Sequence, residues 1–163
     1  MYTAVVEQAR LAPFYSVHGV PDSVDGRFEM IALHMFLVLQ RLKASGQDEL
    51  AQELFDTMFA DMDQSLREMG AGDLGVGRRV RAMAEGLYGR IAAYQAGLAG
   101  NDEILAAALR RNLYGTVSEP GPGGAALSTL CRYLREAAAL LRARPGLELS
   151  AESLRFPPLP ENP

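Results

Sequence analysis

Cysteine is almost absent from the sequence, since Cys131 is the only one among 163 residues. A single cysteine excludes an intramolecular disulfide and a multi-cysteine metal site, and it is typical of a protein in a reducing compartment. We therefore expect a cytoplasmic protein. Cys131 also falls on an apolar helical stripe with Leu127, Leu130 and Leu134, which predicts a small core residue and not a nucleophile.

Histidine is nearly as rare, with only His18 and His34. Neither histidine follows a glutamate by three residues, as the metal-binding pairs of carboxylate-bridged bundles require. No serine lies in a G-x-S-x-G elbow. His34 lies in the most apolar helical segment, where a histidine is usually a core residue hydrogen-bonded to a neighbour. We therefore predict no catalytic residue, no bound metal and no cofactor.

Long apolar runs and export signals are missing as well. The longest apolar run, residues 30–39, contains a histidine and stops at Gln40, well short of the roughly 18 residues that a membrane-spanning helix needs. The first ten residues, MYTAVVEQAR, have no basic region leading into an apolar one, so we expect neither a secretory signal nor a transit peptide. Any membrane contact is expected to be peripheral, at the inner membrane.

Positive charge is scarce in the first half of the chain. The net charge is −4, with 12 acidic and 5 basic residues before Arg78, and 8 acidic and 11 basic residues from Arg78 onward. An acidic chain is poorly suited to nucleic acid as its main partner, because phosphates are bound by clustered lysine and arginine. We therefore expect no nucleic-acid partner.

The pattern of apolar residues indicates an all-α protein. Apolar residues recur at spacings of three and four, no β-type alternation appears, and 163 residues with 48% hydrophobic side chains suffice for one core. We predict a single compact bundle of about six helices, with an irregular N-terminal segment and an extended proline-rich C-terminal tail. The domain is expected over residues 1–145 and the tail over 146–163, and the helices over 2–10, 27–44, 48–69, 76–98, 102–113 and 125–144.

The tail ends in FPPLPENP, where the prolines prevent a regular helix. Its PPLP stretch resembles a polyproline ligand, but a tail laid over the surface of the domain is the interpretation we favour.

The third predicted helix carries both methionines and carboxylates. At 100° per residue, one third of its circumference forms an apolar stripe of Phe55, Met58, Phe59, Met62, Leu66 and Met69. The carboxylates divide between the two flanks of that stripe, with Asp56 and Asp63 on one and Asp61 and Glu68 on the other.

Within each flank the two acids are seven residues apart, about 10.5 Å along the axis, which is too far for one metal ion. We therefore expect Asp63 to pair with Arg67 at i,i+4 and the other acids to be solvated, with metal binding as the weaker alternative.

The stretch GAGDLG, residues 70–75, matches G-x-G-x-x-G but follows a helix, whereas a dinucleotide site requires a strand there. We predict a sharp turn between helices, with Gly70 in the left-handed conformation and Asp73 starting the next helix. Free amides of that helix, with Arg78, Arg79 and Arg81 nearby, leave anion binding open as an alternative.

The fourth predicted helix has two faces that can pack. One side carries the apolar stripe Val80, Met83, Ala84, Leu87, Ile91, Tyr94 and Leu98, and the other carries Ala82, Gly86, Gly89, Ala93 and Gly97. A glycine inside a helix costs about 1 kcal/mol relative to alanine, so three of them suggest close packing against the backbone. The neighbour is either another helix of this domain or a helix of a partner protein.

Three stretches of the sequence closely resemble the ubiquinol-cytochrome c chaperone family. They are ARLAPFYSVHGVPDSVDGRFEMIALHMFLVLQRL, LFDTMFADMDQSLREMGAGDLGVGRRVRAMAEGLYGR and RNLYG, and together they extend over residues 9–114. The resemblance implies an α-helical, non-enzymatic assembly factor that binds newly made cytochrome b and promotes its entry into ubiquinol-cytochrome c reductase, respiratory complex III. Mitochondrial members act with a small helical partner protein near the ribosomal exit. The absence of a transit extension here points to a bacterial member.

We hypothesise that an apolar, methionine-containing groove between helices shields part of the client. The candidate contact residues are the small residues of the fourth helix and the charged residues near them: Ala82, Gly86, Gly89, Ala93, Asp61, Asp63, Arg67, Glu68, Arg78 and Arg79. Two alternatives stay open: a regulatory interaction module unrelated to respiration, and a metal- or haem-handling protein centred on His34 and the aspartates.

Overall fold

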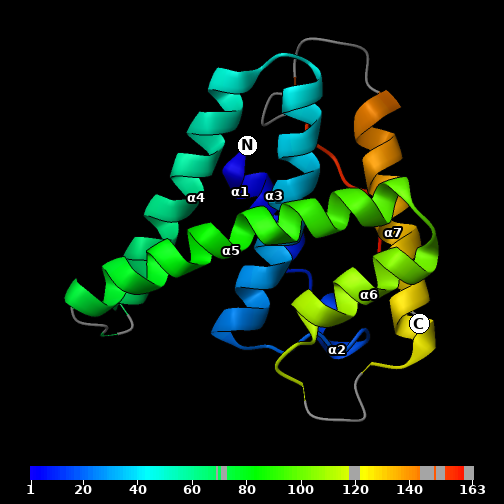
Figure 1. Cartoon of the computed structure of the whole chain (residues 1–163), viewed down its shortest axis with the longest axis horizontal. Coiled ribbons are helices and arrows are strands. Elements are labelled where there is room, and N and C mark those ends of the chain that lie inside the picture. Colours follow the sequence, from blue (N-terminus) through cyan, green and yellow to red (C-terminus); the bar gives the residue numbers. More distant parts are fainter. Residues whose placement is uncertain (69, 71–72, 118–121, 144–148, 150–152, 160–163) are drawn as a thin grey trace.

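Seven helices form the described part of the chain, which contains no β-strand. The structure is a computed structural model and describes residues 1–68, 70, 73–117, 122–143, 149 and 153–159, with 73 and 74 described by their backbone alone. The helices are α1 (Tyr2–Ala9), α2 (Ala12–Ser16), α3 (Val24–Ala44), α4 (Asp48–Glu68), α5 (Asp73–Ala99), α6 (Asp102–Leu113) and α7 (Gly124–Ala143). Figure 1 shows their arrangement. The predicted all-α fold is confirmed.

Helix α3 is the axis of the bundle. All residues from 28 to 39 are buried, which explains why this helix is apolar on every side and lacks the one-sided stripe of a surface helix. It contacts α1, α4, α5, α6 and α7. In Figure 1, α5 crosses in front of α3, while α4 and α7 lie on opposite sides of it.

Local hydrogen bonds fix the helix ends. Ser23 Oγ accepts from the amide of Gly26 at 3.1 Å, so α3 begins at Val24, three residues earlier than predicted. The predicted cap at Asn101 is confirmed, because its Oδ1 accepts from the amide of Ile104 at 3.1 Å. Gly70 has a φ of +84°, which confirms the left-handed residue predicted at the end of α4.

The N-terminal segment is less irregular than predicted, because it contains α2. Pro13 lies in the first turn of that helix, where its missing N–H breaks no intrahelical hydrogen bond. Phe14, on the same short helix, is fully buried, so burial of this aromatic ring favours the helical turn. Between α2 and α3, residues 17–23 lack regular structure.

Helices α5 and α6 form a close antiparallel hairpin. A Cβ added at Gly97 would lie 2.7 Å from Leu105 Cδ1 and 2.9 Å from Leu105 Cα. The predicted close packing against this glycine therefore exists, and its partner is a helix of the same domain.

The described part of the C-terminal tail packs into the core. Residues 154–159 have no regular secondary structure, yet Leu154 and Leu159 are buried and Phe156 packs against the same core cluster. Leu149 is buried as well. The boundary placed at residue 145 stays a prediction, because residues 144–148 lie outside the described part of the chain.

Candidate functional site

The predicted small-residue face of α5 is partly open. Ala82 and Gly89 are exposed, whereas Gly86 and Ala93 are half-buried. An added Cβ at Gly89 meets nothing within 4 Å, while at Gly86 it would lie 2.5 Å from Nη1 of Arg90. The α5 surface available to a partner is therefore centred on Ala82 and Gly89.

Gly86 leaves the space through which Arg90 reaches α3. The Arg90 guanidinium donates from Nε to Oε2 of Glu29 at 2.6 Å and from Nη2 to Oε1, and it lies 5.5 Å from the ring centre of Phe28. The hydrogen bonds to Glu29 raise the pKa of Arg90 above its ordinary value. Such a bidentate, partly buried pair locks α5 onto α3.

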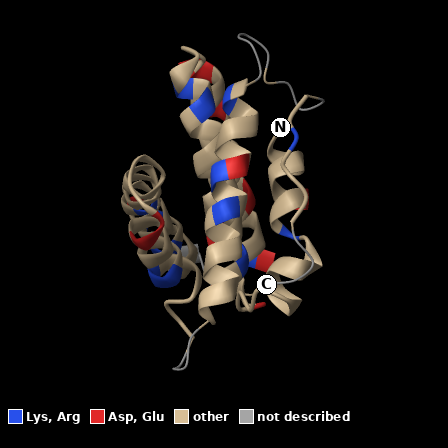
Figure 2. Ribbon diagram, turned by 90° about the vertical axis from the view of Figure 1, so that its right-hand side faces the viewer, with Lys and Arg blue, Asp and Glu red and all other residues tan. Residues whose placement is uncertain are grey.

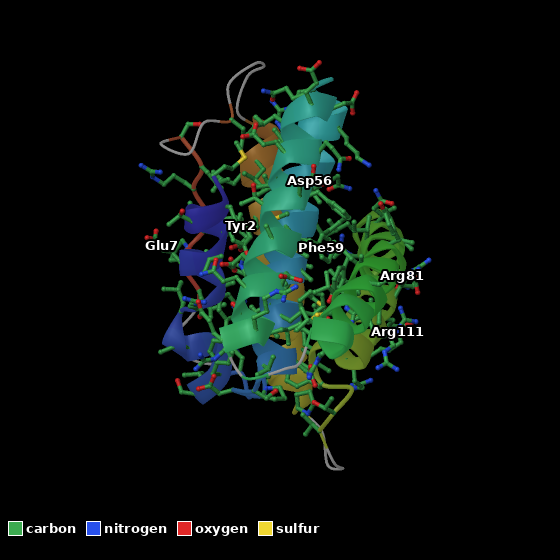
Figure 3. The ribbon with its side chains drawn as sticks, turned by 90° about the vertical axis from the view of Figure 1, so that its left-hand side faces the viewer. Tyr2, Glu7, Asp56, Phe59, Arg81 and Arg111 are labelled. Atoms are coloured by element: carbon green, nitrogen blue, oxygen red, sulfur yellow. The ribbon has the colours of Figure 1, made fainter. Side chains whose placement is uncertain are left out.

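The predicted polar rim of α4 is largely engaged within the chain. Arg67 Nε donates to Asp63 Oδ2 at 2.5 Å, which confirms the predicted i,i+4 pair. Asp61 accepts from the hydroxyl of Tyr2 at 2.8 Å, and Glu68 accepts from Gln64 at 3.0 Å. Figure 3 shows Tyr2 between α1 and α4, so Asp61 is on the α1 side and faces away from α5.

The arginines at the start of α5 differ in their partners. Arg79 lies 3.4 Å from Asp25, and Arg81 lies 3.2 Å from Glu85 on its own helix. Arg78 is exposed and forms no ion pair with any described residue. The proposed anion site falls on residues 71 and 72 and the side chain of Asp73, which lie outside the described residues.

His34 is a core residue, as predicted. Its Nδ1 donates to the carbonyl of Met30 at 2.8 Å, and its Nε2 accepts from the Tyr133 hydroxyl at 2.7 Å, since a carbonyl can only accept. The hydroxyl of Tyr133 in turn accepts from Gln8 at 3.0 Å. Complete burial lowers the pKa of His34 to about 4. The ring is therefore neutral at pH 7, and both nitrogens already have partners.

The other reactive side chain, Cys131, is also buried. Burial raises the pKa of its thiol to about 11, so the thiolate is scarce at neutral pH. Within the described residues, no three His, Cys, Asp or Glu side chains gather closely enough to hold a metal ion. Neither His34 nor Cys131 is thus activated for chemistry, and the described residues hold no group of three such metal ligands.

An open groove lies between α3, α4 and α5. The sequence led us to expect a groove between helices, but not its place or its lining. Its cavity has a volume of about 280 Å³, and we call it the aromatic groove after Phe36, Phe55 and Tyr88 in its wall. Tyr88 is 62% exposed, the largest exposed fraction among the described large apolar side chains. The Phe55 ring lies 5.9 Å from Tyr88 and 4.7 Å from Phe59.

The wall of the aromatic groove combines three rings with aliphatic and polar side chains, and no methionine is among the described residues that line it. Met58 and Met62 on α4 are buried in the core, whereas the half-buried Phe55 and Phe59 turn toward α5. Figure 3 shows Phe59 on the side of α4 that faces α5. A sequence signal did exist, because Tyr88 stands at the edge of the apolar stripe of α5, where a ring packs on one side and meets solvent on the other.

Comparisons with known proteins give a consistent result. The family model described as "Ubiquinol-cytochrome C chaperone" matches residues 16–156. "Ubiquinol-cytochrome-c reductase complex assembly factor 1" of Xenopus laevis is 32% identical over 115 residues, 69% of this chain and 58% of that protein. The human protein of that name is 28% identical over 151 residues, 91% of this chain and 50% of its own length. The chain thus spans little more than half the length of these relatives.

A solved structure resembles the whole fold. The crystal structure of the Cbp3 homolog from Brucella abortus superposes with a TM-score of 0.78 and 37% sequence identity, covering 97% of this chain and 87% of that one. The overall fold of this chain has therefore been seen by experiment in a similar protein.

Proposed function

The chain belongs to the ubiquinol-cytochrome c chaperone family, and from this we propose that it binds newly made cytochrome b and promotes its assembly into ubiquinol-cytochrome c reductase. The proposed role in the assembly of complex III follows from membership of this family. Cytochrome b as the client is what the resemblance to this family implies, and for this chain it is part of the proposal.

The observation that carries the proposal is the open groove between α3, α4 and α5, with an exposed aromatic ring at its edge. Tyr88, 62% exposed, lines this groove. An exposed aromatic ring beside an open groove is typical of surfaces that bind polypeptides, since a partner's side chain can be desolvated there.

We propose that the protein acts without catalysis. Support comes from the two side chains best suited to chemistry: His34 has both nitrogens hydrogen-bonded in the core, and Cys131 is buried with a raised pKa. A chaperone needs only a binding surface, so the absence of an activated group among the described residues is compatible with this role.

None of the described helices is both long and apolar enough to cross a membrane. We propose that contact with the inner membrane is peripheral and is made through the client while it is inserted. A small helical partner protein would fit the same mode of action, since the outward side of α5 has room for another helix at Gly89.

The experiment that tests the proposal is deletion of the gene in its own host. Reduced-minus-oxidised spectra of the membranes would measure b-type cytochrome, and an affinity-tagged copy would test recovery of cytochrome b. We expect the b-type signal and reductase activity to fall on deletion, to return with the tagged copy, and cytochrome b to co-purify with it.

Normal cytochromes after deletion, with no cytochrome b recovered, would contradict the proposal and favour a regulatory module unrelated to respiration. Stoichiometric metal or a haem absorption band in the purified protein would instead favour the metal- or haem-handling alternative.

A further inference from the structure

We propose that the aromatic groove binds a positively charged segment of a partner polypeptide, which inserts one bulky apolar side chain beside Tyr88. This inference rests on the proposed function, because it specifies the chemistry of the segment that the chaperone holds. It places the contact on the side of α5 that faces α4, which is distinct from the outward side that carries Ala82 and Gly89.

The size of the groove suits a side-chain anchor. A cavity of about 280 Å³ accepts one large aromatic or aliphatic side chain but not a whole helix. Phe55 and Ile91 form part of its wall, and Tyr88 stands at its exposed edge. A partner segment would therefore lie across α4 and α5 and insert a single side chain into the groove. Hot-spot residues fill pockets in this way in protein interfaces.

The charge beside the groove selects the partner. Asp48 lines the groove, and Glu49, Glu53 and Asp56 follow it on the exposed side of α4. None of the four forms an ion pair with a described residue, and Asp56 only accepts a hydrogen bond from the amide of Gln52 at 2.8 Å.

Lys43 is the single cation among the described residues that line the cavity. Gln52 lines both the aromatic groove and the surface that carries Glu49, Glu53 and Asp56, so this acidic side of α4 adjoins the groove. One carboxylate, Asp48, and one ammonium, Lys43, line the cavity itself, and the excess of negative charge comes from the three acids of the adjoining α4 surface. That excess favours lysine and arginine on the partner, both in steering and in final register.

The excess of negative charge is local to this side of α4. Helix α7, which faces the viewer in Figure 2, instead carries arginines interspersed with an acidic residue. A guanidinium or ammonium near the groove would also lie close to the exposed ring of Tyr88, where cation–π attraction adds to the ionic one. An anionic lipid surface would be repelled by the α4 carboxylates, so a polypeptide is the occupant that fits.

The experiment uses the full chain and two fluorescently labelled amphipathic helical peptides of 18 residues. Both carry the same leucine and phenylalanine face, and their polar positions hold lysine in one peptide and glutamate in the other. Fluorescence anisotropy should give the lysine peptide at least a tenfold lower Kd, with an affinity that falls as salt is raised. Equal binding of both peptides, or binding of neither, would overturn the inference.

Variants locate the contact. Tyr88→Ala should raise the Kd of the lysine peptide at least tenfold, whereas Ile104→Ala, at another exposed apolar residue on α6, should change it less than twofold. Replacing Glu53→Gln together with Asp56→Asn should weaken binding several-fold and flatten the salt dependence.

The matched charge control is Glu103→Gln together with Glu136→Gln, which removes the same charge from exposed positions on α6 and α7. An equal loss in this control would show attraction to net charge alone and would overturn the assignment to the groove. Binding of the wild type to phosphatidylglycerol vesicles that is abolished by Tyr88→Ala would also overturn it, in favour of a membrane.

The two proposals fail separately. If tagged Tyr88→Ala still recovers cytochrome b and restores the cytochrome spectrum, the groove is not the contact, while the assembly function stands. If deletion leaves the cytochromes unchanged but the peptide results hold, the groove binds a cationic segment and the client has been misidentified.

Discussion

Arg90 on α5 donates two hydrogen bonds to the carboxylate of Glu29 on α3, across 61 residues of sequence. Only 9% of the Glu29 side chain and 24% of the Arg90 side chain are exposed, so this is a largely desolvated pair. Because Tyr88 lies on α5 only two residues before Arg90, the pair also sets the position of the wall of the aromatic groove.

Removing one partner of this pair should destabilise the fold. We predict that Arg90→Ala lowers the free energy of unfolding by about 3 kcal/mol, because it leaves the Glu29 carboxylate buried without a counter-charge. Urea titration followed by circular dichroism measures the loss. The control is Arg81→Ala, whose ion pair with Glu85 is exposed and should contribute little. Equal losses in the two variants would show that burial of the pair is unimportant.

The glycines of α5 should respond to alanine in opposite directions. At Gly97 an added Cβ would lie 2.9 Å from the backbone of Leu105, so Gly97→Ala should cost about 1–3 kcal/mol through overpacking. At Gly89 nothing lies within 4 Å, so Gly89→Ala should stabilise the helix by up to about 1 kcal/mol. Thermal melts of both variants test this, and a shared direction of change would contradict the packing described here.

Acid should weaken the fold through His34. The pKa of His34 is about 4 in the folded protein, against an ordinary value of 6.5. Between these two pH values the unfolded chain therefore binds a proton that the folded chain does not. Stability supplied by the neutral ring is therefore complete above pH 6.5 and falls by about 3 kcal/mol as the pH drops to 4.

We predict that wild-type protein loses about 3 kcal/mol more than His34→Gln between pH 7 and pH 4. Carboxylate contributions are common to both proteins and cancel to first order in the comparison. Urea titrations at the two pH values measure the difference, and parallel losses would mean that the ring is already charged in the fold or is solvated.

Features set by local chemistry were predictable from the sequence. Asn101 caps α6 because its short amide reaches the free backbone N–H of Ile104, and Gly70 ends α4 because only glycine adopts positive φ at little cost. The i,i+4 pair of Asp63 and Arg67 follows from helix geometry in the same way.

Features that depend on which elements meet were not predictable. The pair of Glu29 and Arg90 joins α3 and α5, and no local sequence pattern predicts how these two helices are placed relative to each other. The edge contact of Phe156 with His34, at 5.1 Å between ring centres, depends on the path of a tail without regular structure. The aromatic groove arises in the same way, from the crossing of three helices, so the single-helix stripes could indicate its rings but not its opening.

The tail should contribute to stability as part of the core. Leu154 is 2% exposed, and we predict that Leu154→Ala lowers the free energy of unfolding by about 2 kcal/mol, the low end for a buried leucine because a tail can relax around the cavity. Pro158→Ala, at an exposed tail position, is the matched control. If removal of residues 146–163 leaves the melting temperature unchanged, the tail is not part of the folded unit.

The outward side of α5 should bind the client without supporting the fold. Ala82 and Gly89 are exposed, so Ala82→Gln should leave the melting temperature nearly unchanged and Gly89→Gln should not lower it, while both greatly reduce recovery of cytochrome b. Glutamine is chosen because it adds bulk and polarity without charge, which separates this surface from the electrostatics of α4. Ala107→Gln, at an exposed alanine of α6, is the control. Full recovery of cytochrome b with both α5 variants would show that the outward side of α5 does not contact the client. The contact on α5 would then be limited to the groove side, at Tyr88.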